Sequence, residues 1–123
     1  MTAELPLPSA LPPLTVVGAG KLGTAVAKAW GQRGGSVAAR VTAADTWEPQ
    51  GLVFEATAPD AAVGNLTRCI EVQVPVVTGT TGWLERLDEV RDLALRADST
   101  AFYSTNFSPG VHALNAIAKH AAG

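Results

Sequence analysis

The sequence predicts an α/β fold, a doubly wound parallel sheet of about five strands in three layers. Short apolar segments alternate with segments of helical apolar spacing along most of the chain. A Gly-x-Gly-x-x-Gly turn, residues 18–23, separates the first apolar segment from the first helical one. Alternation of this kind needs helices on both faces of the sheet and brings the strands' carboxyl ends to one edge, as in a Rossmann-like domain.

Composition limits the classes of function. The chain has 123 residues, 47% hydrophobic and 16% charged, with a formal net charge of −2, which suits one globular domain. Its basic residues are scattered, so no nucleic-acid partner is expected. Cys69 is the only cysteine, so we expect no thiol metal cage, no other metal site and a reducing, cytoplasmic location. We see neither a signal peptide nor an apolar run of membrane-spanning length, and expect no membrane partner.

The proline content suggests where the folded domain begins. Residues 1–13 hold Pro6, Pro8, Pro12 and Pro13, half of the eight prolines. We expect this segment to be a disordered tail and residues 14–123 to form a dinucleotide-binding domain.

The glycine turn supplies the first candidate site. A strand is expected from Leu14, and a helix follows the turn as far as Arg33. Gly18 allows the sharp turn, Gly20 allows a pyrophosphate to approach the backbone, and Gly23 allows close packing of helix and strand. The alternative is a tight β–α turn that binds nothing.

The second strand is expected over Ser36–Val41, covered on both faces because it has few polar positions. Where dinucleotide-binding domains usually place an acid for the ribose, this chain has Arg40. An arginine there can pair with a 2′-phosphate, so NADPH should be accepted; the alternative is a solvated arginine. Residues 42–50 show no clear helix, so this crossover is expected to be short.

The remaining elements continue the alternation, and Cys69 falls among the buried positions of a helix. We expect strands at Leu52–Glu55, Val74–Val77 and Thr100–Ser104, and helices beginning at Pro59, Leu84 and Ser108.

Two further loops carry polar groups at the carboxyl ends of strands. Residues 79–82 expose backbone N–H groups and the hydroxyls of Thr80 and Thr81, a cradle for a carboxylate or an amide. Residues 104–108 contain Asn106, which both donates and accepts hydrogen bonds. The alternative for both loops is ordinary capping and turn chemistry.

These loops resemble a known family. Val53-Phe54-Glu55-Ala56-Thr57-Ala58-Pro59-Asp60-Ala61, Val76-Val77-Thr78-Gly79-Thr80-Thr81-Gly82 and Ser104-Thr105-Asn106-Phe107-Ser108-Pro109-Gly110-Val111 are similar to segments of dihydrodipicolinate reductases, also called 4-hydroxy-tetrahydrodipicolinate reductases. The resemblance covers about residues 14–121. It implies hydride transfer from NADPH or NADH to a cyclic dicarboxylate in lysine and diaminopimelate biosynthesis.

The resemblance also implies roles for individual residues. Arg40 would lie by the adenosine ribose. The pyrophosphate would be held by Gly18, Ala19, Gly20, Lys21 and Leu22. The nicotinamide and the substrate carboxylate would lie by Gly79, Thr80 and Thr81. The nicotinamide amide would be fixed by Ser104, Thr105, Asn106 and Phe107.

The chain departs from the family in three places. Many members have Gly-x-x-Gly-x-x-Gly, whereas this chain has the shorter Gly18-Ala19-Gly20-Lys21-Leu22-Gly23, as in a shorter-chained branch of the family. The acidic-Phe-Ser/Thr segment appears as Glu55-Ala56-Thr57, without the aromatic ring. The family's substrate domain, with its catalytic His-His and Lys segment, follows the helix that begins near Ser108, whereas this sequence ends at Gly123. We therefore expect this chain to be the cofactor half of a reductase, without a catalytic residue and without turnover of substrate on its own. We also expect a homo-oligomer. His112 and the pair Lys119-His120 are interpreted as structural or solvated.

Other classes of function remain open at this stage. The domain could belong to another amino-acid-pathway dehydrogenase, but residues 79–82 and 104–108 together favour the reductase. It could be a non-catalytic dinucleotide-sensing module, although the sequence shows no partner or DNA-binding domain. It could also be a structural fragment without a ligand.

Overall fold

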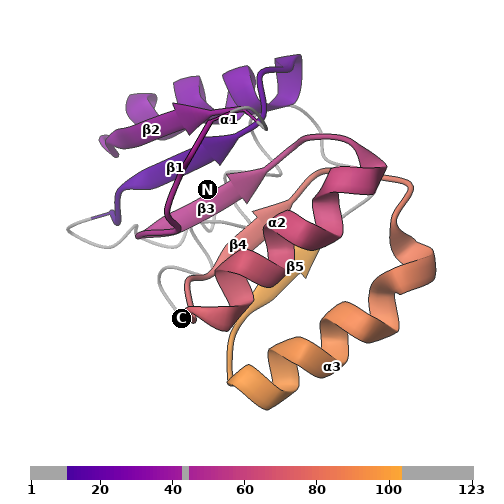
Figure 1. The fold of residues 1–123 in the computed structure, drawn as a ribbon. Coiled ribbons are helices and arrows are strands. Elements are labelled where there is room, and N and C mark those ends of the chain that lie inside the picture. Colours follow the sequence, from indigo (N-terminus) through magenta and orange to yellow (C-terminus); the bar gives the residue numbers. More distant parts are fainter. Residues whose placement is uncertain (1–10, 43–44, 104–123) are drawn as a thin grey trace, which may run out of the picture.

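The structure, a computed structural model, describes residues 11–42 and 45–103. Its five strands form one parallel sheet in the order β2-β1-β3-β4-β5, which confirms the predicted α/β class (Figure 1). The elements, in chain order, are β1 (Leu14–Val17), α1 (Lys21–Gln32), β2 (Val37–Val41), β3 (Leu52–Glu55), α2 (Pro59–Glu71), β4 (Val76–Thr78), the 3₁₀ turn η1 (Leu84–Arg86), α3 (Leu87–Ala97) and β5 (Ala101–Tyr103).

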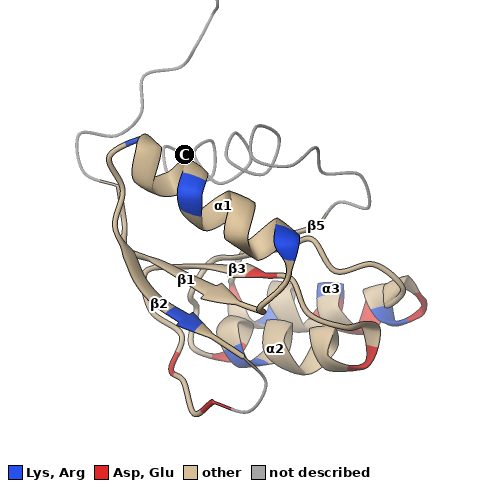
Figure 2. Ribbon diagram, turned by 90° about the horizontal axis from the view of Figure 1, so that it is seen from above, with Lys and Arg blue, Asp and Glu red and all other residues tan. Residues whose placement is uncertain are grey.

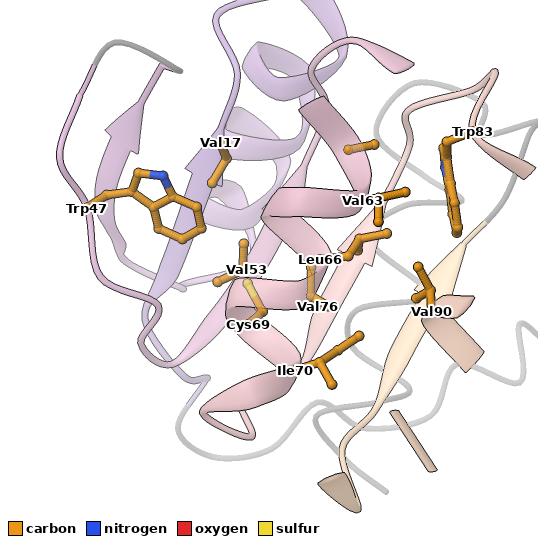
Figure 3. Packing of buried hydrophobic residues seen from close by; sticks show 11 residues of the cluster. Val17, Trp47, Val53, Val63, Leu66, Cys69, Ile70, Val76, Trp83 and Val90 are labelled. Carbon is orange, nitrogen blue, oxygen red and sulfur yellow. The ribbon is translucent and has the colours of Figure 1, made fainter. Parts of the chain in front are cut away.

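Helices cover both faces of the sheet, which confirms the three layers. Helix α1 lies on one face, and α2 and α3 lie side by side on the other (Figures 1 and 2). Because strand side chains alternate between faces, β1 and β3 each contribute to two cores. The α1 core includes Val16, Trp30 and Phe54. The α2–α3 core includes Val17 and Val53 (Figure 3).

Central strands end level with one another, and this positions the loops that follow them. In the ladders, Val17 of β1 pairs with Glu55 of β3, and Glu55 pairs with Thr78 of β4. The turn after β1, the segment after β3 and the loop after β4 therefore emerge side by side, at the edge where ligands of such sheets bind.

The expectation that the second strand is covered on both faces is wrong. β2 is an edge strand of the described sheet, and three of its five residues are exposed. Its small apolar residues, Ala38 among them, resemble those of a central strand. Sequence order could not reveal that the chain places this strand outside β1.

Several predicted boundaries shift by one to three residues. β4 begins at Val76 and includes Thr78, and the helix expected from Leu84 begins with the 3₁₀ turn before α3. As predicted, no helix forms in the described part of the crossover from β2 to β3. Leu11 packs on the α1 core and the Pro13 carbonyl accepts the Leu52 N–H at 3.0 Å, so packing begins before residue 14. The expected last helix and residues 1–10 lie outside the described residues.

Candidate functional site

The glycine turn has the conformation that the motif predicts. Gly18 has a φ of +125°, and a Cβ there would overlap the carbonyl oxygen of Ala56 in the segment after β3. A Cβ at Gly23 would lie 3.1 Å from Val16 Cγ1, so α1 packs directly on β1. A Cβ at Gly20, in contrast, would meet nothing within 4 Å, which leaves open space beside the backbone.

Helix α1 presents free donors at this turn. Gly20 is its N-cap residue, no side chain caps the helix, and the first turn carries no acid. The helix contains Lys21 and Lys28 and no acidic residue (Figure 2). The unpaired N–H groups and the positive end of the helix dipole therefore favour an anion beside Gly20.

Arg40 lies against the same turn. Its side chain reaches from β2, where Nε donates to the Gly18 carbonyl at 3.3 Å and Nη2 donates to the Gly20 carbonyl at 3.1 Å. In the part of the chain that the structure describes, Nη1 has no hydrogen-bond partner. The arginine is therefore an exposed but anchored cation beside the glycine turn, rather than a fully solvated one.

A shallow cleft of about 260 Å³ joins the glycine turn to the loop after β4. The segment after β3, which contributes Ala56, Thr57 and Pro59, lines the cleft between these two loops and is called its floor. The cleft brings together most of the candidate residues in the described part: Gly20, Lys21, Leu22, Gly79, Thr80 and Thr81, with Ala56, Thr57 and Pro59. Gly18, Ala19 and Arg40 lie at or beside the turn but do not line this cleft.

The loop after β4 differs from the expected open cradle. The Gly79 N–H donates to the Glu55 carbonyl at 2.8 Å, and the Thr80 N–H donates to Thr78 Oγ1 at 3.1 Å. Thr80 is 6% exposed, so the expectation of two exposed hydroxyls is wrong for this residue. Thr81 is exposed, and no hydrogen-bond partner of it lies among the described residues.

The carboxylate of Glu55 is the centre of this arrangement, and it is 0% exposed. Its Oε1 accepts hydrogen bonds from the hydroxyls of Thr78, at 2.5 Å, and Thr80, at 2.7 Å. Its Oε2 accepts the Thr57 hydroxyl and Asn65 Nδ2, the latter at 3.2 Å. The Thr80 hydroxyl also accepts the Thr57 N–H at 2.8 Å. Four donors thus satisfy one buried anion.

Reasoning from the sequence gave Glu55 no role. The signal was present, because an acid ends a strand of otherwise apolar residues and threonines follow this strand and the next. A buried carboxylate needs donors, and short hydroxyl side chains at level strand ends can supply them. Asn65 lies inside α2, and its position in the sequence did not indicate that it donates to Glu55.

Cys69 is buried in the α2–α3 core, as expected (Figure 3). Burial, with a smaller contribution from the charge of Glu55 and against the opposing charge of Arg68, raises its pKa from 9.0 to about 12. A thiol of this kind stays protonated near neutral pH and is therefore a poor nucleophile. Within the described residues, no three side chains of the metal-binding types gather.

The third predicted loop, with Ser104, Thr105, Asn106 and Phe107, lies outside the described residues, as do His112, Lys119 and His120.

A family model described as "Dihydrodipicolinate reductase, N-terminus" matches residues 36–107, more than half of the chain. The chain belongs to this family. The family match begins after the glycine turn, so the turn's evidence comes from its own geometry.

One relative bears this out. The 4-hydroxy-tetrahydrodipicolinate reductase of Christiangramia forsetii is 36% identical over 72 residues, which are 58% of this chain and 30% of that protein. This reductase-family chain therefore aligns with less than a third of that relative's length. No helix in residues 11–42 and 45–103 combines the length and apolar character needed to cross a bilayer.

Proposed function

We propose that this domain binds NAD(P)H as the cofactor half of a 4-hydroxy-tetrahydrodipicolinate reductase. The observation that carries the proposal is the cleft in which the uncapped start of α1 and the Gly79–Thr81 loop face each other. The residues present fit such a ligand, because Gly20 leaves space for a pyrophosphate and the N–H donors beside it are unpaired.

Each side of the cleft has its own part. The turn from Gly18 to Leu22 would hold the pyrophosphate, and Arg40 would lie by the adenosine ribose. Gly79 to Thr81, with Ser104 to Phe107, would orient the nicotinamide toward a cyclic dicarboxylate. When bound, NAD(P)H supplies the hydride. The chain's own contribution is to bind and orient it, for which none of the proposed residues needs to react.

Arg40 supports acceptance of NADPH as well as NADH. Its Nε and Nη2 hold the glycine turn, while Nη1 remains available to a 2′-phosphate. The same side chain would thus shape the turn for both nucleotides and contact the phosphate of one.

The test is a titration of the 123-residue chain with NADH and with NADPH, followed by nucleotide fluorescence. We expect saturable binding of at least one nucleotide. Arg40→Ala should weaken the binding of both nucleotides. The affinity for NADPH should fall about tenfold more than the affinity for NADH, which is the usual loss for one charge-assisted contact. Arg33→Ala, an exposed arginine at the far end of α1, is the control and should bind as the wild type does. A folded chain that binds neither nucleotide would contradict the proposal.

The wider context of the domain remains proposed as well. The lone buried thiol supports a reducing, cytoplasmic location. Reduction of the dicarboxylate, the extension of the domain to residue 123, and the homo-oligomer are proposals for the reductase to which this domain belongs.

A further inference from the structure

We infer that Glu55 is a positioning residue, which holds the loop after β4 in its ligand-binding geometry without contacting the ligand. The inference rests on the proposed function, because the geometry of the loop matters only if the cleft binds a ligand. Glu55 is fully buried and does not line the cleft. Its effect must therefore pass through the residues that its carboxylate holds.

The carboxylate connects two segments that do line the cleft. Thr57 belongs to the floor and Thr80 to the far side, and both hydroxyls donate to Glu55. Because each threonine hydroxyl has one proton, neither can donate to a ligand while it donates to Glu55. Glu55 thus turns these two hydroxyls inward and leaves Thr81 to face the cleft.

The backbone of the loop follows the same constraint. Glu55 accepts the Gly79 N–H through its carbonyl and the Thr78 hydroxyl through its carboxylate, and Thr78 Oγ1 in turn accepts the Thr80 N–H. The bonds fix the loop at consecutive residues against the end of β3. A loop fixed in this way binds without first losing conformational entropy.

Replacing the carboxylate by an amide breaks this pattern without changing its size. In Glu55→Gln, one acceptor oxygen becomes an NH₂ donor. Depending on how the amide is oriented, this NH₂ group faces the hydroxyls of Thr78 and Thr80, or it faces the Thr57 hydroxyl and Asn65 Nδ2. The hydroxyls can rotate to accept from this NH₂ group, but their protons then no longer bond to residue 55, and Asn65 Nδ2 cannot accept at all. The hydrogen bonds that hold the loop must therefore rearrange, and we expect the loop to shift relative to the floor.

Two variants and a matched control test the inference in the 123-residue chain. Thr78→Val removes a hydroxyl from the network, and Thr15→Val makes the same change on β1, where the Thr15 hydroxyl has no partner within the described residues. Both threonines are 1% exposed. With NADH and NADPH as probes, we expect Glu55→Gln and Thr78→Val to bind about tenfold more weakly than wild type and Thr15→Val to bind equally well.

Affinity unchanged in Glu55→Gln or Thr78→Val, with the variant shown to be folded, would overturn the inference. A residue important only for stability would lower the unfolding midpoint without changing the affinity of the folded chain. Ile70→Val, a core change in α2 away from the cleft, provides that comparison.

Amide hydrogen exchange gives a readout that needs no ligand and no variant. In the wild type, the Thr57 and Thr80 amides should exchange at least about tenfold more slowly than that of exposed Thr81, because both donate to held hydroxyls. Glu55→Gln should remove this difference and leave the amides of α2 unchanged. Equal exchange of all three amides in the wild type would overturn the inference. If the wild type binds no nucleotide, the proposed function fails and this measurement alone decides the role of Glu55.

Discussion

The two sides of the cleft are built by different means. The glycine wall, residues 18–22, takes its shape from backbone conformation and from the absence of side chains. The threonine wall, residues 79–81, takes its shape from side-chain hydrogen bonds to Glu55, which lies more than 20 residues earlier in the chain. The first wall depends mainly on the conformation of its own residues, with Arg40 of β2 donating to two of its carbonyls, whereas the second depends on a carboxylate from another strand.

This difference determines how each wall should respond to change. A substitution in the glycine wall should act through space, by filling a position where backbone or ligand must lie. A substitution in the threonine wall should act through unpaired polar groups, because a lost donor leaves an oxygen lone pair of the buried Glu55 side chain without a partner.

Gly18→Ala should have the largest effect. A left-handed φ strains a Cβ-bearing residue by about 1–3 kcal/mol, and overlap with the Ala56 carbonyl adds to that cost. We expect the free energy of unfolding in urea to fall by about 3 kcal/mol or more, with loss of nucleotide binding. Gly64→Ala is the control, since this exposed glycine lies inside α2 with open space around it, and alanine there should stabilise the chain slightly. A stable Gly18→Ala variant would show that the turn can rearrange.

The threonine wall allows a comparison of adjacent hydroxyls. Thr80→Val should lower the free energy of unfolding by about 2 kcal/mol, because it leaves the Thr57 N–H and one carboxylate lone pair of Glu55 unsatisfied. Thr81→Val should change it by less than about 0.5 kcal/mol, because this side chain is exposed. Urea denaturation of both variants gives the comparison. Equal losses would mean that the inward hydroxyl of Thr80 contributes no more to stability than the exposed hydroxyl of Thr81 does.

The same distinction explains what the sequence could predict. Order and type of the strands and helices followed from apolar spacing, and the glycine turn followed from its motif, because both are local patterns. The exposed edge position of β2 did not follow, since it depends on which neighbour a strand takes. The inward turn of Thr80 did not follow either, because it requires knowing that Glu55 and Thr78 end level in the sheet.

Arg40 illustrates an intermediate case. Its place near the glycine turn followed from the motif spacing, but its hydrogen bonds to Gly18 and Gly20 did not. The spacing gives the strand end on which a residue lies, while the partner of a long side chain depends on packing. Its role toward a 2′-phosphate remains a prediction.

Gly20→Ala should separate binding from stability in the glycine wall. Gly20 has a φ of −83°, which alanine adopts, and its surroundings are open, so the free energy of unfolding should change by less than about 1 kcal/mol. The new methyl group would occupy the space proposed for the pyrophosphate, and nucleotide affinity should fall by about tenfold. Gly31→Ala, at the other end of α1 and also open, should leave affinity unchanged. Unchanged affinity in Gly20→Ala would place the pyrophosphate elsewhere.

Cys69 lies in the α2–α3 core, where the charge of Glu55 contributes to its raised pKa. The effect of this thiol on the free energy of unfolding should be the smallest of those predicted. The folded chain holds the thiol proton more tightly than the unfolded chain, because its pKa is raised to about 12 from 9.0. This contribution to stability is therefore complete below pH 9 and is lost as the pH rises toward 12. Between about pH 8 and 9.5, we expect the free energy of unfolding to fall by about 0.8 kcal/mol more in the wild type than in Cys69→Ala.

The comparison with Cys69→Ala removes the effect of other groups that titrate in the same range. It also separates the thiol's ionisation from its packing, because the packing lost with the sulfur does not change with pH. Glu55 contributes to the raised pKa through its negative charge, second to burial. Glu55→Gln should therefore lower the folded pKa, so the extra fall in stability relative to Glu55→Gln/Cys69→Ala should level off at a lower pH than it does in the wild type. Levelling off at the same pH in both comparisons would mean that the charge of Glu55 does not contribute to the raised pKa of Cys69.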